Sequence, residues 1–281
     1  MSALLSARRA EELIESFSDA RVGVVGDVSL DIEISGRVRR LSPEAPVPVV
    51  ENPTDRMMLG CAGNVAHNVL TLGAGVSLLG LVGEDAHGEE MRALLSHFYA
   101  ADPLLVVDPE RTTTTKTRIV AAYHGQAQHL VRIDRESRQP ISPGLRRQLL
   151  DALRDIFPRL SVLVIDDYGK GIVTSALVAE LVELRGAFAD VSGWFPILVD
   201  PKSPAIEMDR GVDWLTPNHY EVAVATGVET DSPTVGGGGA QVPGADRGGA
   251  SARDARWEGM SLFVGTRRAS TWLRIRARCS T

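Results

Sequence analysis

Carboxylate, amide and glycine residues gather just after the first apolar segments of the sequence, where they could bind a ligand rich in hydroxyl groups. Asp27 and Asp31 lie at or just past the end of the apolar run RVGVVG, and ionised carboxylates are strong acceptors for sugar hydroxyls. Gly60, Gly63 and Asn64 occur together in GCAGN, where small residues let a backbone approach a ligand closely. Solvated turn carboxylates, and glycines that only let a helix pack on a sheet, are the alternative interpretations.

Three cations indicate a place for a phosphate ester. Lys116 and Arg118 lie in TTKTRIVA and Arg132 lies in HLVRIDRE, two segments whose polar and apolar residues alternate as in strands. Arg and Lys bind phosphate through charge-assisted hydrogen bonds, so their convergence would suit a phosphorylated ligand. A solvated sheet face would give the same pattern.

Two loops and one short motif add candidates for the same site. Asp167 in DDYGKG and Lys202 in DPK each follow an apolar segment, which would place them at the carboxyl edge of a sheet unless they are ordinary loop residues. Asn218 and Glu221, in TPNHYE, are three residues apart at a predicted helix start. There an amide could contact phosphate and a carboxylate could hold a hydrated Mg²⁺. A helix cap with an acid in the first turn is the alternative.

Composition narrows the classes of function. The chain has 281 residues and a formal charge of -6, which argues against nucleic acid or an anionic membrane as the main partner. No apolar run is long enough to cross a bilayer, and a cytoplasmic location is expected. Cys61 and Cys279 are expected to be free thiols. The six histidines show no metal-ligand spacing, and no serine lies in a nucleophile elbow.

The elements that would position these residues repeat in the order strand, polar turn, helix. This repetition predicts a single α/β domain over residues 1–281, with a doubly wound, mostly parallel sheet. The proline-rich, alternating stretch SGRVRRLSPEAPVPVVEN fits a small projecting sheet better than the central one. After about Glu229 the pattern stops, apart from a short predicted strand in EGMSLFVG.

Taken together, the motifs resemble the ribokinase-type (pfkB) carbohydrate kinases, and within them the heptose-7-phosphate kinases that form the first domain of bifunctional ADP-heptose synthesis enzymes. The resemblance runs from about Val24 to Glu221 through VVGDVSLD, LSPEAPVPVV, GCAGNVAHN, LVGEDAHG, TTKTRIVA, LVRIDRE, DDYGKG, LVDPK and LTPNHYE. LSPEAPVPVV is the part most specific to the heptose branch. The resemblance implies a Rossmann-like sheet with a β lid at about residues 32–50 and 112–134, often used for homodimerisation.

The same resemblance implies ATP, Mg²⁺ and transfer of the γ-phosphate to the anomeric hydroxyl of a heptose 7-phosphate, for use in surface glycans. Its implied roles fall into two groups. Substrate binding is implied for Asp27, Asp31, Gly60, Cys61, Asn64, Lys116, Arg118, Arg132 and Asp167. Nucleotide binding is implied for Lys202, Asn218 and Glu221, with Glu221 also holding Mg²⁺ through water. Cys61 stands where the family usually has glycine, which would crowd the sugar slightly.

The end of the chain departs from the family. The family's G-A-G-D motif supplies an anion hole and the general-base aspartate, and this sequence contains no G-A-G-D, so no catalytic residue is assigned. Read one nucleotide later, permitted codons for GGGGAQVPGADRGGASARDARWE give a helix followed by H-L-L-V-T-R-G-G-R. Read one nucleotide earlier, TWLRIRARCST gives E-V-F-D-V. We therefore expect frameshifts that make residues 235–258 and 265–281 aberrant and leave the kinase domain incomplete, with residues from about 232 to 258 and the last dozen poorly packed.

Two other functions remain open from the sequence. Another pfkB sugar kinase, acting on adenosine, ribose or fructose phosphate, would share most of the motifs. A non-catalytic binder of sugar phosphate or nucleotide is the prediction if the tail is genuine, because the general base would then be missing.

Overall fold

The computed structural model describes residues 6–98, 104–123, 126–202, 211–218, 220–221, 224, 250–254, 260–264 and 273–275. Its helices are α1 (Ala7–Glu15), α2 (Ala62–Thr71), α3 (Ala86–Phe98), α4 (Pro143–Ile156) and α5 (Ser175–Ser192). Among these described helices, none combines the length and the apolar character needed to span a lipid bilayer.

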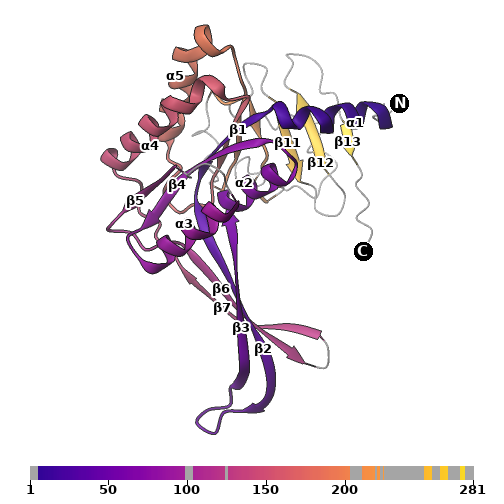
Figure 1. Ribbon diagram of the computed structural model, residues 1–281, viewed down its shortest axis with the longest axis vertical. Coiled ribbons are helices and arrows are strands. Elements are labelled where there is room, and N and C mark those ends of the chain that lie inside the picture. Colours follow the sequence, from indigo (N-terminus) through magenta and orange to yellow (C-terminus); the bar gives the residue numbers. More distant parts are fainter. Residues whose placement is uncertain are drawn as a thin grey trace.

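A nine-stranded sheet forms the centre of the molecule, with the order β13-β12-β11-β10-β9-β8-β1-β4-β5 (Figure 1). Its described strand pairs are parallel except for β11 with β12 and β12 with β13, which are antiparallel. The inner strands are rich in Val, Ile and Leu, as strands covered on both faces require. The strands are β1 (Arg21–Gly26), β4 (Gly75–Gly83), β5 (Leu104–Asp108), β8 (Val162–Asp166), β9 (Ile197–Asp200), β10 (Trp214–Leu215), β11 (Ala250–Asp254), β12 (Met260–Val264) and β13 (Leu273–Ile275).

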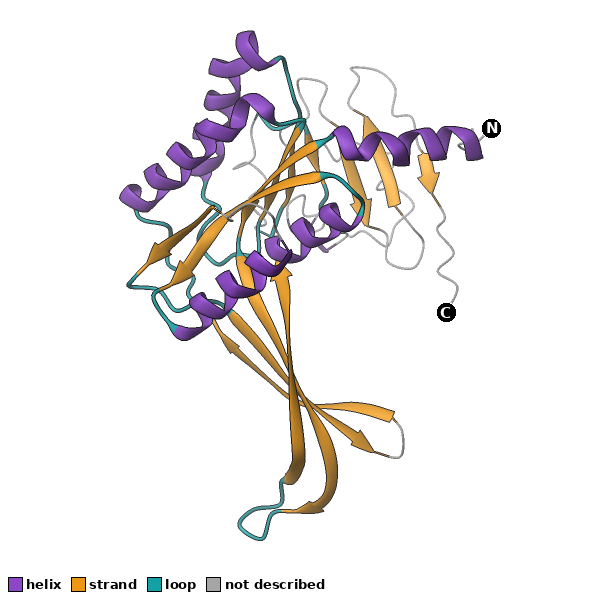
Figure 2. Ribbon diagram, in the orientation of Figure 1, coloured by secondary structure: helices purple, strands orange, loops and turns teal. Residues whose placement is uncertain are grey.

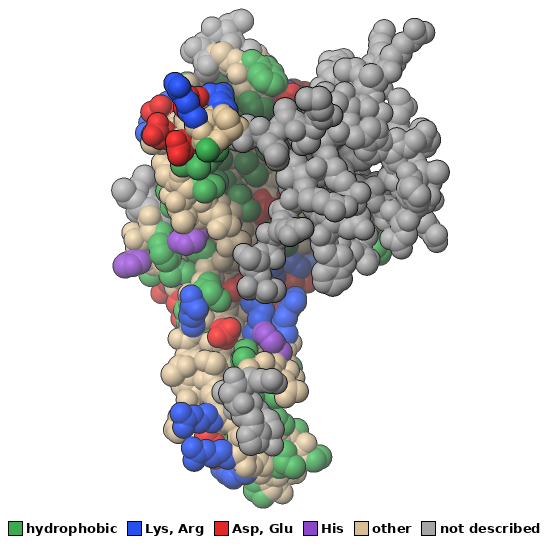
Figure 3. Space-filling model, turned by 90° about the vertical axis from the view of Figure 1, so that its right-hand side faces the viewer, with side chains coloured by type: hydrophobic (Ala, Val, Ile, Leu, Met, Phe, Trp, Pro, Cys, Tyr) green, Lys and Arg blue, Asp and Glu red, His purple; other side chains and the backbone are tan. Residues whose placement is uncertain are grey.

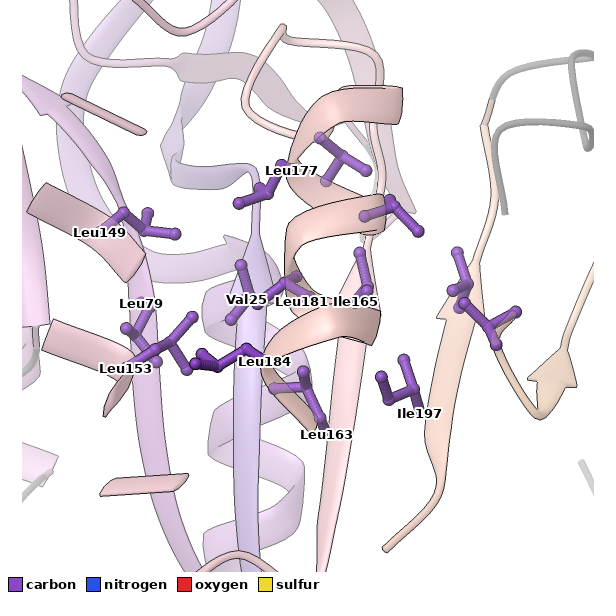
Figure 4. Close-up of a cluster of buried hydrophobic side chains, with 14 of the residues drawn as sticks. Val25, Leu79, Leu149, Leu153, Leu163, Ile165, Leu177, Leu181, Leu184 and Ile197 are labelled. Atoms are coloured by element: carbon purple, nitrogen blue, oxygen red, sulfur yellow. The ribbon is translucent and has the colours of Figure 1, made fainter. Parts of the chain in front are cut away.

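Helices cover both faces of this sheet (Figure 1). Successive residues of β1 point to opposite faces, so Val24 packs in one buried cluster with α2 and α3, and Val25 packs in another with α4 and α5. Figure 4 shows the second cluster, in which Leu149 and Leu153 of α4 and Leu177 of α5 lie against the sheet. The sheet is therefore rigidly held from both sides.

A second, four-stranded sheet projects from the body in the order β3-β2-β6-β7 (Figure 2). Its strands are β2 (Val28–Leu41), β3 (Pro48–Cys61), β6 (Thr115–Tyr123) and β7 (Gln126–Arg135), and together they are called the lid sheet here. They contain most of the segments expected to form a lid. The predicted fold class, a doubly wound, mostly parallel α/β sheet with a small β lid, is confirmed.

The chain order places a switch point beside β1. From β1 the chain continues through β2 and β3 to β4 and β5 on one side of the sheet, and later it fills the other side with β8, β9 and β10. Ligands of open α/β sheets bind at the carboxyl ends of the strands next to such a point. Asp27, Asp166 and Asp200 lie at the carboxyl ends of β1, β8 and β9.

The described part of the tail consists of three strands. β12 matches the strand predicted in EGMSLFVG, while β11 and β13 lie within the two segments predicted to be aberrant. The rest of residues 235–258 and 265–281, and the packing predicted for them, lie outside the described residues.

Candidate active site

Asp27 joins the two sheets and holds the loop after β8. It is the single residue between β1 and β2, and it is only 1% exposed. Its Oδ2 accepts hydrogen bonds from the backbone N–H groups of Tyr168 at 2.8 Å and Lys170 at 2.9 Å, and its Oδ1 accepts from Ile172 at 3.3 Å. Burial raises the pKa of Asp27, and these backbone N–H groups oppose the rise. In this structure Asp27 positions the loop, because both of its carboxylate oxygens accept backbone hydrogen bonds from it.

Asp31 and Gly60 face each other across β2 and β3. A Cβ atom on Gly60 would lie 2.3 Å from Asp31 Oδ1 and 2.3 Å from Ser29 Oγ, so only glycine leaves room for the carboxylate. Asp31 Oδ1 accepts a hydrogen bond from Ser29 Oγ at 3.2 Å, and Oδ2 accepts one from Arg118 Nη1 at 2.8 Å. The structure thus brings three predicted site residues, Asp31, Gly60 and Arg118, together.

The remaining lid cations lie on the same face of the lid sheet. Arg118 is the cross-strand neighbour of Arg132, and Lys116 is the neighbour of both Asp31 and Asp134. Arg132 donates to Asp134 Oδ1 at 2.7 Å through its Nε. Each of these arginines is therefore paired with a carboxylate, which orients its guanidinium group. A bound anion would have to replace that carboxylate or share the arginine with it.

Lys116 instead contacts a thiol and an aromatic ring. Its Nζ lies 3.0 Å from Cys61 Sγ and 5.0 Å from the ring centroid of Tyr168. Burial raises the pKa of the Cys61 thiol, and the same cause raises the pKa of Tyr168 to about 12, so both groups stay neutral at pH 7. Among the described carboxylates, none lies within ion-pair distance of Lys116.

Cys61 occupies a backbone conformation that normally needs glycine. It has φ +52° and ψ −133° at the start of α2, and it is buried. A side chain in this region is strained, which gives a physical reason for the glycine expected here. Asn64 lies in the first turn of α2 and is exposed.

Asp167 and Lys202 lie where their loops were predicted to open. Asp167 is buried and its Oδ1 accepts a hydrogen bond from Gly169 N at 2.7 Å, which closes a tight turn. Lys202 is exposed, with its Nζ 3.9 Å from Glu221 Oε1. Lys202 and Glu221 thus lie side by side, whereas Asp167 fixes a loop.

Asn218 and Glu221 form a reciprocal cap at a helix start. Asn218 Oδ1 accepts from the backbone N–H groups of Tyr220 and Glu221, each at 3.0 Å, and Glu221 Oε2 accepts from Asn218 N at 2.7 Å. Burial raises the pKa of Glu221, and Asp200 adds to the rise. The capping interpretation is therefore realised in this structure, and Glu221 Oε1 lies 3.9 Å from Lys202 Nζ.

Asp166 is a residue that the sequence motifs did not single out. It is 1% exposed at the end of β8, and neither of its carboxylate oxygens has a hydrogen-bond partner in the described structure. Burial, followed by the charges of Asp200 and Asp27, raises the pKa of Asp166 to about 7. The acids at the ends of β1, β8 and β9 therefore form a row that reaches from the lid sheet toward Glu221.

An open, mostly parallel sheet with acids and cations at its carboxyl edge, joined directly to a projecting β sheet, defines the ribokinase-like class of α/β folds. Two solved structures share it. Phosphofructokinase-2 from Escherichia coli, in its tetrameric inhibited form, matches 90% of this chain and 78% of its own with a TM-score of 0.64 and 16% identity. Arabidopsis thaliana ribokinase complexed with ribose and ATP matches 91% and 78% with a TM-score of 0.61 and 16% identity.

The family model for pfkB family carbohydrate kinases matches residues 19–237, and the chain belongs to this family. The bifunctional protein HldE of Paramagnetospirillum magneticum is 38% identical over 221 residues, which cover 79% of this chain and 43% of that protein. HldE of Caulobacter vibrioides is 41% identical over 216 residues, covering 77% and 42%. The chain thus spans less than half the length of the curated relatives it matches.

Proposed function

We propose that this carbohydrate kinase uses ATP to phosphorylate the anomeric hydroxyl of D-glycero-D-manno-heptose 7-phosphate, giving the 1,7-bisphosphate for ADP-heptose synthesis. The observation that carries the proposal is the 36–41% identity to HldE proteins over about 79% of the chain. The segment LSPEAPVPVV, between β2 and β3, is the motif that most resembles heptose-7-phosphate kinases. ATP and sugar phosphates are cytoplasmic metabolites, so the cytoplasm remains the proposed location.

The sugar phosphate would bind between the lid sheet and the carboxyl edge of the main sheet. Asp31 is the carboxylate available for sugar hydroxyls, because Gly60 leaves its Oδ1 uncovered by a side chain. Arg118 and Arg132 are adjacent across β6 and β7 and would share the 7-phosphate. Lys116, which lies on the Cys61 thiol and the Tyr168 ring and has no ion-pair partner among the described carboxylates, can turn to the ligand without breaking such a pair.

ATP and Mg²⁺ would bind further along the same edge, near Lys202, Asn218 and Glu221. ATP supplies the phosphoryl group, and Mg²⁺ supplies positive charge to its phosphates. No described cluster of three or more His, Cys, Asp or Glu side chains could hold a metal by itself. That fits a Mg²⁺ ion held mainly by phosphate and water, with Glu221 Oε1 contacting a water ligand. Lys202 would neutralise phosphate charge beside it.

A homodimer through the lid sheet is part of the proposal. The face opposite Asp31 and the cations carries the exposed apolar side chains of Met57, on the edge strand β3, and of Val131 and Ile133, on the other edge strand β7. Such a face favours burial against a second copy. Figure 3 shows that Lys and Arg side chains also gather along the projecting sheet. Sedimentation of wild type and Ile133→Lys tests this, since a charge on the face should shift the protein toward monomer.

The test of the function compares this chain with a chain whose reading frame has been restored to give LVTRG and DVTGAGD. Each is supplied with ATP, Mg²⁺ and heptose 7-phosphate, fructose 6-phosphate, ribose or adenosine, and ADP and anomeric phosphate are measured. The restored chain should turn over heptose 7-phosphate fastest. A clear preference for another sugar would refute the proposed substrate.

A second candidate is a binder without turnover, favoured by the absence of G-A-G-D from the sequence. Loss of the general base costs about 10²- to 10⁴-fold in rate, so the present chain should bind sugar phosphate but turn it over at least that much more slowly. β11 supports the frameshift hypothesis: a parallel strand forms at Ala250–Asp254, which reads ASARD, where the shifted frame places H-L-L-V-T. Resequencing the gene across codons 225 to 281 and beyond tests the hypothesis directly.

A further inference from the structure

The carboxylate of Asp166 is held in place by its backbone. β8 pairs with β1 on one side and β9 on the other, and Asp166 lies in both ladders. Its carbonyl oxygen accepts from Asp27 N at 3.2 Å and packs so closely on Gly26 that a Cβ there would lie 2.1 Å away. The backbone at Asp166 therefore cannot shift to expose the side chain to water, and the carboxyl group stays buried.

Asp27 provides the comparison for this position. Both aspartates are 1% exposed and they lie at the ends of neighbouring strands. Asp27 accepts three backbone hydrogen bonds, whereas Asp166 accepts none from the described residues. A buried polar group without a partner costs free energy, and native structures rarely keep one without a use.

The surroundings of Asp166 do not supply the missing donor. Asp200 of β9, Asp27 after β1 and the adjacent Asp167 disfavour its ionised form, while Lys116 of β6 favours it. Lys116 Nζ is placed on Cys61 Sγ, beside Tyr168. The donor must therefore come from Lys116 after a rearrangement or from a bound molecule.

We propose that Asp166 is a further substrate-binding residue, whose carboxylate accepts a hydrogen bond from a hydroxyl group of the bound sugar. The inference rests on the proposed function and deepens it, because it adds a specificity-determining contact beside Asp31 and Lys116. Sugar hydroxyls are donors that need no charge, so they can reach an acid already crowded by other acids. A ligand that carries only phosphate would contact the lid cations and leave Asp166 unpaired.

The contact couples sugar binding to a proton. Without ligand, Asp166 is part protonated near neutral pH, because burial raises its pKa to about 7. A hydroxyl donor favours the ionised carboxylate and lowers that pKa. Binding near pH 7 should therefore release a fraction of one proton from Asp166, and sugar affinity should rise with pH through this range.

Calorimetry in buffers of different ionisation enthalpy counts the protons released. Heptose 7-phosphate, fructose 6-phosphate and inorganic phosphate are titrated into the full chain and into Asp166→Asn at pH 7 and pH 8. The wild type should release more protons than Asp166→Asn for a sugar phosphate, and equally many for inorganic phosphate. At pH 8 the variant should bind the sugar phosphate about 10- to 100-fold more weakly, as for loss of a hydrogen bond to a charged group. Asp213→Asn, a carboxylate at the opposite edge of the sheet that already has protein partners, should behave like the wild type.

The outcomes separate this inference from the proposed substrate. If binding of fructose 6-phosphate releases protons in a way that depends on Asp166, and heptose 7-phosphate does not bind, the inference stands and the proposed substrate is refuted. Heptose 7-phosphate binding with equal proton counts in wild type and Asp166→Asn keeps the substrate and overturns the inference. Three other results also overturn the inference: proton uptake on binding, no binding of any sugar phosphate, or binding of inorganic phosphate that depends on Asp166. The last result would assign the donor to Lys116. Should Asp166→Asn fail to fold, Asp166→Ser replaces it, and absence of release from the wild type alone still refutes the inference.

Discussion

Replacing the buried acid at the end of β8 should change how stability depends on pH. In the unfolded chain Asp166 has a pKa near 3.8, and in the folded protein burial raises that pKa to about 7. The folded state therefore holds the proton more tightly. The resulting stabilisation is complete below the unfolded pKa and is lost as the pH rises through the folded pKa.

The size of this loss follows from the shift. Each unit of pKa corresponds to about 1.4 kcal/mol, so a rise from 3.8 to about 7 makes the folded protein less stable by about 4 kcal/mol at high pH than at low pH. Between pH 5 and pH 8 the change is about 3 kcal/mol, because part of the loss has already occurred at pH 5. Asp166→Asn keeps the shape of the side chain and removes the titration. Its free energy of unfolding, relative to the wild type, should therefore increase by about 3 kcal/mol from pH 5 to pH 8.

Urea unfolding at half-unit steps of pH measures this difference. Asp27, Asp200 and Glu221 also have raised pKa values, so the wild-type curve alone would mix their contributions. The difference between Asp166→Asn and wild type isolates the single group, and Asp213→Asn serves as the control whose difference from wild type stays constant. A constant difference for Asp166→Asn as well, to within about 0.5 kcal/mol, would refute the account of a buried, unpaired carboxyl.

Three further substitutions test the site. Cys61→Gly should stabilise the protein by about 1 kcal/mol in urea unfolding, since glycine relieves the strained φ of +52°, whereas Cys61→Ala should not. Gly60→Ala should weaken heptose 7-phosphate binding at least about tenfold in calorimetry, because the new methyl group would displace Asp31; unchanged affinity would remove Asp31 from the site. Glu221→Gln should cost about 1 kcal/mol of stability, because the charged acceptor for Asn218 N is lost. It should also weaken ATP binding only when Mg²⁺ is present, and a loss independent of Mg²⁺ would leave Glu221 as a cap alone.

The fold could be predicted from the sequence because its signals are local. Apolar strands followed by polar turns and helices gave the doubly wound sheet, and the alternation around Arg118 and Arg132 gave the second sheet. The parts of the fold that the sequence did not predict also have physical reasons. The end of β1 at Gly26 was predicted, but nothing in RVGVVGDVSLDIEI indicates that β2 begins only one residue later, since both strands are apolar. ASARD has no strand pattern, yet β11 forms there.

In the candidate site, some of the contacts could be predicted from the sequence and others could not. Asp31, Gly60 and Arg118, which the resemblance assigns to the substrate site, lie together in the structure, and their role in binding stays a prediction. Residue types could not show that the Asp27 carboxylate accepts hydrogen bonds from three backbone N–H groups, because those donors come from residues about 140 positions away in the sequence. Asp166 was overlooked because its neighbour Asp167 fitted the motif. The burial of Asp166 at the end of V-L-V-I-D is seen in the structure and has no counterpart in the residue types.

The direct passage from β1 into β2 makes the projecting sheet a lever. β2 is 14 residues long, roughly 45 Å at strand spacing, with register irregularities against β3 between Ser35 and Leu41, and Asp31 lies near its base. A rotation of a few degrees at the base would carry the far end through several ångströms, so a second subunit that grips the outer part of the sheet would hold the angle at which Asp31 and the lid cations meet the sugar. Subunit association would then set the geometry of binding from a distance, through the stiffness of one continuous strand.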